Sequence, residues 1–328
     1  MIGVLASDWM PAMIRWTADG PVVDWCHLGE ARFTDPFFEQ TIAGAMEHAF
    51  NLLFRHHTPL VDFAASTDAK PELRLAGLIF HMSRCGSTVI SQMLAALPRN
   101  VVLSEPALID QILRLPTRLP NVSQDELVRC LRGLVAALGR RRQAAERDLV
   151  IKLDAWHILL WPLIRRAFPD VPWIFVYRNP LEVLASLAQS PPIQMFPGRI
   201  DPALLGAQPA ELAGLSLDAY SALVLGRYCG AAIVHHGDGG LLVEYGELPE
   251  VACSTIPDHF GLRFEEAEVA AMRAAARFDA KSPRHVFRKD SASKRREASK
   301  EMRRLAETQL NPLYARLEAL RLPGRAAG

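Results

Sequence analysis

The segment Leu78–Leu94, LIFHMSRCGSTVISQML, contains the feature that decides the fold. Its apolar run ends at a serine-arginine-cysteine-glycine turn, and a helix-like pattern begins at once. A strand that passes directly into a helix leaves the first helical N–H groups pointing outward, where they and the helix dipole attract an anion. Gly86 allows close backbone approach, and Ser87 and Thr88 add hydroxyl donors. With the positive charge of Arg84, the turn predicts a phosphate or sulfate site.

This turn is not the usual loop for nucleoside triphosphates. That loop has the pattern GxxxxGK[ST], whose lysine and hydroxyl contact the phosphates and magnesium. Here no such lysine follows Gly86, and no residue is an obvious magnesium partner. The alternative interpretation is an ordinary strand-to-helix turn with a capping serine. Cys85 lies within the turn, where a helix N-terminus can lower a thiol pKa, but we interpret it as a small loop residue.

Short apolar runs alternate with amphipathic stretches between residues 75 and 260. Runs that are apolar on both faces and separated by helices are typical of a buried parallel sheet. The pattern predicts an α/β fold with three layers, in which helices cover both faces of a central parallel sheet. The expected strands are Gly77–Met82, Val101–Leu103, Leu149–Lys152, Trp173–Tyr177 and Leu241–Tyr245.

A second strand-to-helix corner lies in WIFVYRNPLEVLASL. Arg178 follows the strand, Asn179 is a favourable N-cap, and Pro180 suits the first helical turn. Ser186 follows Arg178 by eight residues on the predicted helix. Ligands of such sheets bind at the carboxyl ends of the strands, so two corners with an arginine each could hold two phosphate groups of one ligand.

The two corners together resemble the sulfotransferases that use 3′-phosphoadenosine-5′-phosphosulfate (PAPS). Their 5′-phosphosulfate loop is matched by Arg84, Cys85, Gly86, Ser87 and Thr88, and their 3′-phosphate motif by Arg178 and Ser186. Tyr245 and Leu248 match a further family motif, Tyr-Glu-Asp-Leu, from which Gly246 and Glu247 depart. The resemblance covers about residues 76–300. It implies a fold like that of P-loop nucleotide hydrolases and kinases, PAPS as the sulfate donor, and no metal.

Sulfuryl transfer requires a base for the acceptor hydroxyl and a positive group at the leaving oxygen. Arg84 is the candidate for the leaving oxygen. Glu105 follows Arg84 by 21 residues and resembles the catalytic glutamate of the protein-tyrosine sulfotransferases; a plain helix-start carboxylate is the alternative. His157 is the second candidate base, because the steroid and phenol sulfotransferases use a histidine after the corresponding strand. Lys152 either holds the sulfuryl group or bridging oxygen, or simply ends a strand.

The 328 residues are 50% hydrophobic and carry a formal charge of +1, so any anion site must be local. Five cysteines without paired spacing and the lack of an apolar membrane segment predict a cytoplasmic protein. Residues 1–74 form an irregular, aromatic-rich extension whose best helix, over 35–54, Asp35 can cap. Residues 75–328 form the expected sulfotransferase domain. The extension and the proline-rich segment Gln189–Gln208 are expected to shape the acceptor pocket.

Residues 281–304 carry ten basic and three acidic side chains. The resemblance implies that a basic loop here closes over the 3′-phosphate and adenosine, with Lys281, Arg288, Lys289 and Lys294 as candidates and Tyr245 near the adenine. Two other functions stay open: a small-molecule kinase on the related fold, and a non-catalytic nucleotide- or nucleic-acid-binding protein. We expect no nucleic-acid partner, since only two residues of the stretch could stack on bases. The acceptor hydroxyl could belong to a small alcohol, phenol, sugar, lipid or peptide.

Overall fold

The computed structural model describes residues 8–65, 71–280, 282–286 and 291–322. At its centre is a five-stranded parallel sheet in the order β5-β6-β4-β7-β8. Its strands are β4 (Arg74–His81), β5 (Asn100–Ser104), β6 (Asp148–Lys152), β7 (Trp173–Tyr177) and β8 (Gly240–Glu244). The predicted parallel sheet is therefore confirmed, and each expected strand matches within a few residues.

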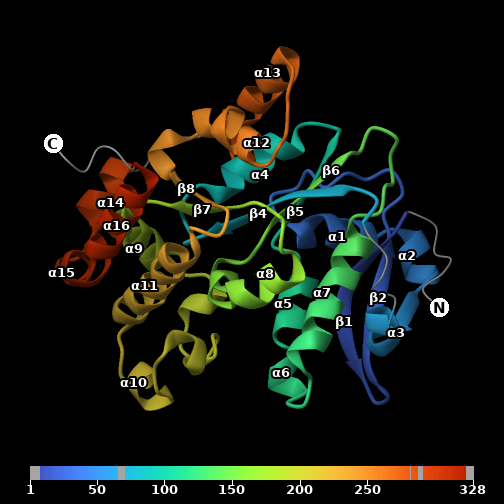
Figure 1. Cartoon of the computed structure of the whole chain (residues 1–328), viewed down its shortest axis with the longest axis horizontal. Coiled ribbons are helices and arrows are strands. Elements are labelled where there is room, and N and C mark those ends of the chain that lie inside the picture. The colour runs from blue at the N-terminus through green and yellow to red at the C-terminus, as the bar shows by residue number, and fades with distance from the viewer. Residues whose placement is uncertain (1–7, 66–70, 281, 287–290, 323–328) are drawn as a thin grey trace.

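Helices cover both faces of the sheet, which confirms the three-layer fold (Figure 1). Helices α4, α12 and α13 lie on one face, and α5, α7, α8 and α11 lie on the other. The helices from residue 87 onward are α4 (Ser87–Ala95), α5 (Ala107–Leu113), α6 (Leu115–Arg118), α7 (Gln124–Leu138), α8 (Trp161–Ala167), α9 (Pro180–Gln189), α10 (Pro209–Ala213), α11 (Leu217–His235), α12 (Thr255–His259), α13 (Glu266–Ala275), α14 (Ser291–Glu297), α15 (Lys300–Leu305) and α16 (Asn311–Arg321).

Short helical turns connect several of these elements. They are η1 (Ala155–Leu160), η2 (Ile193–Met195), η3 (Pro202–Leu205), η4 (Tyr245–Glu247), η5 (Glu250–Cys253) and η6 (Ala306–Leu310). A two-stranded ribbon, β9 (Phe278–Asp279) with β10 (Ser282–Val286), precedes α14. A capping box begins α7, where the Ser123 side chain accepts from the Glu126 N–H. A local sequence signal thus sets the start of this helix.

The N-terminal segment is more regular than the sequence predicted. It forms a three-stranded antiparallel sheet of β1 (Trp9–Thr17), β2 (Gly20–His27) and β3 (His56–Pro59), so the expectation of an irregular extension is wrong. The expected single helix is two, α1 (Phe38–Met46) and α2 (Ala49–Leu53), followed by α3 (Leu60–Ala65). Asp35 does not cap α1, because Phe37 is the N-cap residue and Asp35 accepts from the Thr41 hydroxyl instead.

The N-terminal sheet packs on the parallel-sheet domain through β1, which contacts α5 and α7. The Gln111 side chain accepts a hydrogen bond from the Ile14 N–H at 2.7 Å and donates to the Ile14 carbonyl at 3.2 Å. This sheet lies at one end of the molecule, and α14–α16 lie at the other (Figure 1). The division at residue 74 stays a prediction.

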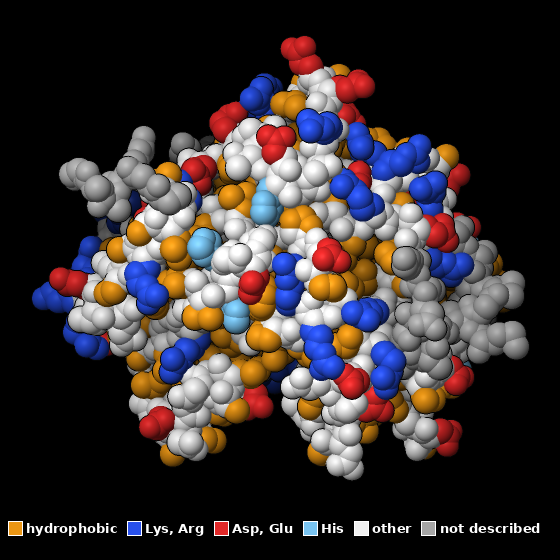
Figure 2. Space-filling model, viewed as in Figure 1, with side chains coloured by type: hydrophobic (Ala, Val, Ile, Leu, Met, Phe, Trp, Pro, Cys, Tyr) orange, Lys and Arg blue, Asp and Glu red, His pale blue; other side chains and the backbone are white. Residues whose placement is uncertain are grey.

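Charged side chains of both signs are interspersed over the face shown in Figure 2, in keeping with the near-zero net charge. Among the described residues, α11 alone is long and apolar enough to cross a membrane by length and composition. Core helices pass the same test, and half of this stretch is buried. The expected location in the cytoplasm stays a prediction.

Candidate functional site

A cavity of about 480 Å³ opens at the edge of the sheet where the parallel strands end. Its volume is in the range of small-molecule sites. Both predicted corners contribute to its wall, although they are almost a hundred residues apart in the chain. The predicted residues that line it are Arg84, Cys85, Gly86, Ser87, Thr88, Glu105, Arg178, Ser186, Tyr245 and Lys294.

The first corner has a strained backbone. In the described chain, the non-glycine residues with positive φ are Ser83 (71°), Arg84 (50°) and Glu105 (54°), and all three line this cavity. Such conformations cost about 1–3 kcal/mol each and concentrate at functional sites. Gly86 has φ +84°, and a Cβ there would lie 2.8 Å from the side chains of Tyr245 and Leu248. The corner therefore requires glycine.

Two side chains of this corner are held by neighbouring segments. The Cys85 thiol donates to the Val176 carbonyl at 3.0 Å, and burial raises the pKa of Cys85 to about 11. The expectation that this turn lowers the pKa of the Cys85 thiol is therefore wrong, because burial outweighs the nearby positive charges. The Arg84 guanidinium donates to the Ser190 carbonyl, at the start of the proline-rich segment.

The second corner is a regular capped helix. The Asn179 side chain accepts from the N–H groups of Leu181 and Glu182, and Pro180 is the first residue of α9, as predicted. Arg178 is 5% exposed. Its Nε donates to Glu182 at 2.8 Å, and its guanidinium lies 4.1 Å from the centre of the Tyr245 ring.

Helix α14 brings residues of the basic C-terminal stretch to the same place. Lys294 lines the cavity, and Ser291 accepts from Arg178 at 3.1 Å. Arg295, which the sequence did not single out, donates to Glu182 at 2.6 Å. Glu182 belongs to α9 and is 2% exposed, and its ion pair with Arg295 connects α9 and α14. The other three candidates of this stretch, Lys281, Arg288 and Lys289, lie outside the described residues.

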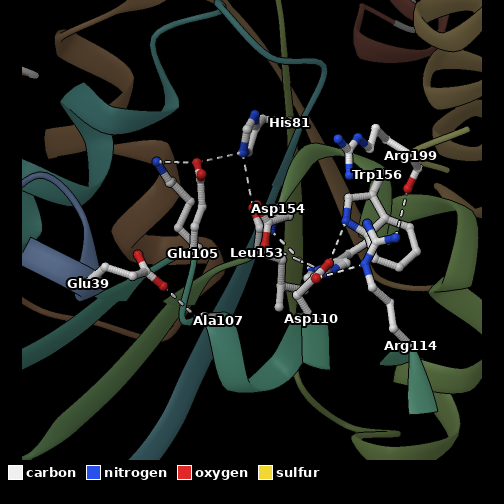
Figure 3. A network of polar contacts seen from close by, with 12 residues as sticks. Glu39, His81, Glu105, Ala107, Asp110, Arg114, Leu153, Asp154, Trp156 and Arg199 are labelled. Carbon is white, nitrogen blue, oxygen red and sulfur yellow. Dashed lines mark hydrogen bonds and ion pairs between the residues drawn. The ribbon is translucent and has the colours of Figure 1, made fainter. Parts of the chain in front are cut away.

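Glu105 lies on the cavity wall between a lysine and a histidine. Its Oε1 is 2.8 Å from Lys152 Nζ and 3.4 Å from His81 Nε2 (Figure 3). Burial alone would raise the pKa of Glu105, but the Lys152 ammonium and His81 outweigh it and hold that pKa well below its ordinary value. Glu105 is therefore ionised at neutral pH, as a proton acceptor must be.

Lys152 is fully buried and lies behind this wall. Its Nζ donates to the Thr88 hydroxyl at 3.2 Å as well as contacting Glu105, and it lies 4.9 Å from the centre of the Phe37 ring. Lys152 thus connects the anion turn with the carboxylate. His81 lies beside the same carboxylate, and its Nδ1 accepts from the Ser83 N–H at 3.1 Å.

His157 does not line this cavity. Its ring is 1% exposed, its Nδ1 accepts from the Asp154 N–H at 3.2 Å, and its Nε2 lies 3.3 Å from Asp110. These bonds assign the ring proton to Nε2 and leave neither nitrogen available to a substrate hydroxyl. The geometry therefore favours Glu105 over His157 as a base.

A second cavity, of about 230 Å³, adjoins the first. Glu105 and Gln194 line both cavities. The other residues that line the second cavity are Glu39, Ala107, Asp110, Arg114, Asp154, Trp156 and Ile193. The proline-rich segment thus contributes to both cavities, through Ser190, Pro192 and Gln194 to the first and through Ile193 and Gln194 to the second.

Asp110, Asp154 and His157 are the group in the described chain whose ligand atoms lie close enough for a metal ion, within 4.8 Å of one another. The Asp110 carboxylate already accepts from the Trp156 indole at 2.8 Å and from Arg114 at 2.8 Å. These donors satisfy the carboxylate and hold it beside a guanidinium. The cluster is therefore better suited to hydrogen bonding than to a cation site, and metal independence stays a prediction.

The chain matches no protein-family model and no curated protein. The solved structures similar to it include sulfotransferases. One from Alicyclobacillus acidocaldarius is 15% identical, with 76% of this chain and 96% of that chain covered and a TM-score of 0.44. One from Mycobacterium avium is 14% identical, with 66% and 71% covered and a TM-score of 0.41. A mouse sulfotransferase complexed with PAP (3′-phosphoadenosine-5′-phosphate) is 10% identical, with 81% of this chain and 90% of that chain covered and a TM-score of 0.36. At these values, function has to be inferred from the side chains of the site.

The residues that sequence reasoning missed are those without a local motif. Phe37 and Glu39 come from the N-terminal segment, and Asp110 and Trp156 follow strands at positions that no pattern singled out. Glu182 lies four residues after Arg178 on a predicted helix, which is the spacing of an ion pair. Among these missed residues, Glu182 is therefore the one whose role the sequence spacing could have indicated.

Proposed function

We propose that this protein is a sulfotransferase that moves the sulfuryl group of PAPS to an acceptor hydroxyl. The observation that carries the proposal is the convergence of two arginine-bearing strand-to-helix corners on one cavity, with the ionised Glu105 in its wall. PAPS has two separate phosphate positions and one sulfuryl group, so two anion sites around one nucleotide-sized cavity suit it.

The donor would lie along the cavity with its 5′-phosphosulfate at the first corner. There the N–H groups that open α4, the Ser87 and Thr88 hydroxyls and Arg84 would hold it. Arg84 would exchange the Ser190 carbonyl for the donor. The 3′-phosphate would lie at the second corner, against Arg178 and Ser186.

The adenosine end of the donor would meet Tyr245 and α14. The Tyr245 ring already lies against the Arg178 guanidinium, which places an aromatic face beside the 3′-phosphate position. Lys294 lines the same region. We assign Lys281, Arg288 and Lys289 to closing over this end by the resemblance alone.

In the transfer, the acceptor oxygen attacks the sulfur as the bond from sulfur to the bridging phosphate oxygen breaks. The products are a sulfate ester and 3′-phosphoadenosine-5′-phosphate (PAP), and the hydroxyl proton passes to Glu105. In-line geometry and charge stabilisation at the leaving oxygen supply much of the rate. Lys152 can turn from Glu105 toward the donor next to Thr88, and losing this ammonium would raise the pKa of Glu105 and make it a stronger base.

Calorimetry of PAP binding tests the donor site. We expect micromolar binding without metal, weakened at least about 30-fold in Arg178→Ala, because a buried charged contact is worth about 2–5 kcal/mol. Arg129→Ala, which removes an exposed arginine from α7, is the control and should bind like the wild type. Binding of ATP with magnesium but not of PAP would favour the kinase alternative, and binding of neither would refute the donor site.

A further inference from the structure

The second cavity adjoins the first, and Glu105 lies in the wall of both. Because Glu105 and Gln194 line both cavities, a molecule in the second one can reach the same carboxylate that borders the first. A hydroxyl delivered from there would meet Glu105 with the sulfuryl position beyond it. The cavity therefore has the position that an acceptor pocket needs.

The lining of this cavity is strongly acidic. Four carboxylates line it, those of Glu39, Glu105, Asp110 and Asp154, and Arg114 is the one basic side chain among the described lining residues. Figure 3 shows Asp154 and Asp110 between Glu105 and the Arg114–Trp156 pair, with Glu39 set apart and directed toward Ala107. Like charges this close are costly unless a positive group offsets them.

Only two of the four carboxylates have a strong cationic partner. Glu105 is paired with Lys152, and Asp110 with Arg114 at 2.8 Å. In the described chain, neither Glu39 nor Asp154 lies within ion-pair distance of a lysine or arginine; His157 is 3.8 Å from Asp154. These two carboxyl groups thus form no ion pair with a lysine or arginine of the described chain, although Glu39 Oε1 accepts from the Ala107 N–H at 2.9 Å.

The effect on these two groups is visible in their pKa values. Burial, and less strongly the Glu105 carboxylate, raises the pKa of Glu39 against the lowering influence of two backbone N–H groups and of Lys152. Burial and the neighbouring carboxylates raise the pKa of Asp154 to about 7, against the influence of His157. Both shifts are those of carboxylates that a bound cation would stabilise.

The remaining walls of the cavity favour a small, partly flat molecule. The Trp156 ring forms one wall and is itself covered by the Arg114 guanidinium at 4.3 Å. Arg114 also donates to the Arg199 carbonyl at 2.7 Å, so the proline-rich segment is tied to this wall. Ile193, from the same segment, closes another side.

We propose that the second cavity is the acceptor site and that it selects a small alcohol or phenol carrying a protonated amine. The ammonium would lie between Glu39 and Asp154 while the hydroxyl meets Glu105. This inference rests on the proposed function and adds the class of acceptor to it. An acidic acceptor, such as a peptide rich in carboxylates, is disfavoured by the same four side chains.

A set of three phenols that differ in charge tests the proposal by binding rather than turnover. Tyramine is cationic, 4-ethylphenol is neutral, and 4-hydroxyphenylacetate is anionic, on nearly the same scaffold. With the full-length protein saturated with PAP, we expect tyramine to bind about tenfold more tightly than 4-ethylphenol, the size of one charge-assisted hydrogen bond. The acid should bind most weakly. Equal binding of amine and neutral phenol, or no binding of any of the three, would overturn the proposal.

Two neutral variants locate the selectivity. Glu39→Gln and Asp154→Asn should each bring tyramine affinity close to that of 4-ethylphenol, whose own affinity should not change. Glu47→Gln, an exposed carboxylate at the other end of α1, is the matched control and should keep the full preference. A preference that survives both cavity variants would contradict the proposed cation site.

PAP binding separates this inference from the proposed function. If PAP binds and Arg178→Ala abolishes it while the three phenols bind alike, the acceptor class is wrong and the sulfotransferase proposal stands. If PAP itself does not bind, the proposed function fails first, and tyramine binding to the free protein would then indicate an amine site unrelated to sulfuryl transfer.

Discussion

The two cavities that share Glu105 are opposite in charge. The first is lined by hydrogen-bond donors and cations, from the N–H groups at the start of α4 to Arg84, Arg178 and Lys294. The second is lined by four carboxylates. The sheet contributes to this contrast, since the turns after its strands place Arg84, Glu105, Asp154 and Arg178 at one edge, while Glu39 comes from α1 and Asp110 from α5.

This difference shows how one site can hold two substrates and keep them in order. Under the two proposals, the second cavity would repel the anionic donor and the first would repel a cationic acceptor. Glu105 lies at the boundary, where Lys152 supplies the positive charge that keeps it ionised. The two opposite charges would thus direct each proposed substrate to its own cavity.

The largest expected effect is on kcat and comes from replacing Glu105, which lies in the wall of both cavities. Glu105→Gln keeps the shape of the side chain but cannot accept a proton, so kcat should fall about 10²–10⁴-fold, as is usual for loss of a general base. PAP affinity should change little. His157→Gln is the comparison variant, since that ring faces Asp110 instead of the first cavity, and its kcat should stay within a few-fold of wild type. A larger fall in kcat in His157→Gln than in Glu105→Gln would instead indicate that His157 is the general base.

The next largest effect tests the donor side. Gly86→Ala places a methyl group 2.8 Å from Tyr245 and Leu248 and holds a residue with a side chain at φ +84°, so we expect PAP affinity to fall about 30-fold. Gly44→Ala is the matched control, because a Cβ at Gly44, within α1, meets nothing within 4 Å. Calorimetry on both variants measures the difference. Unchanged PAP affinity in Gly86→Ala would show that the first corner does not contact the donor.

The proposed preference for a cationic acceptor should depend on pH through Asp154. Asp154, faced by Glu39, Glu105, Asp110 and His157, has its pKa raised to about 7, so its carboxyl group is mostly protonated at pH 6 and ionised at pH 8. The preference for tyramine over 4-ethylphenol should therefore rise about tenfold between pH 6 and 8, while both phenols and the amine keep their protons. Asp154→Asn should flatten this rise.

The raised pKa of Asp154 also predicts how the stability of the protein changes with pH. A carboxyl whose pKa is raised on folding binds more protons in the native than in the unfolded protein between about pH 4 and 7. Its contribution therefore favours the folded protein at the acidic end and is lost as the pH rises through 7. The difference in free energy of unfolding between wild type and Asp154→Asn, measured with urea at several pH values, should change in that direction; a difference independent of pH would contradict the raised pKa.

The two corners of the first cavity were largely predictable from sequence, and the lining of the second cavity was not. The donor corners are local: a strand, a turn and a helix start lie within a dozen residues, so Gly86 and Arg178 could be recognised from their neighbours. The second cavity is assembled from α1, the turn after β5, the turn after β6 and the proline-rich segment. No local pattern brings Glu39 to Asp154; the packing of β1 on α5 and α7 does.

The strained backbone was also beyond prediction. Positive φ at Ser83, Arg84 and Glu105 contradicts the preference of each residue type, and only the surrounding hydrogen bonds hold it, such as the 2.7 Å bond from the Glu105 N–H to the Lys152 carbonyl. By contrast, Asn179 and Pro180 follow the ordinary rules for a helix start, and there the prediction was confirmed.

That contrast leads to the smallest expected effect, at the regular corner. Asn179→Ala removes the side chain that accepts from two N–H groups of α9. The loss should cost about 1 kcal/mol of stability and lower the melting temperature by about 2 °C. Since Arg178 is held separately by Glu182 and Tyr245, PAP affinity should stay within about twofold of wild type, well inside the range of one weak hydrogen bond. A fall in PAP affinity as large as that of Gly86→Ala would mean that the start of α9 contacts the donor through its backbone, and the two corners would then hold phosphate in the same way.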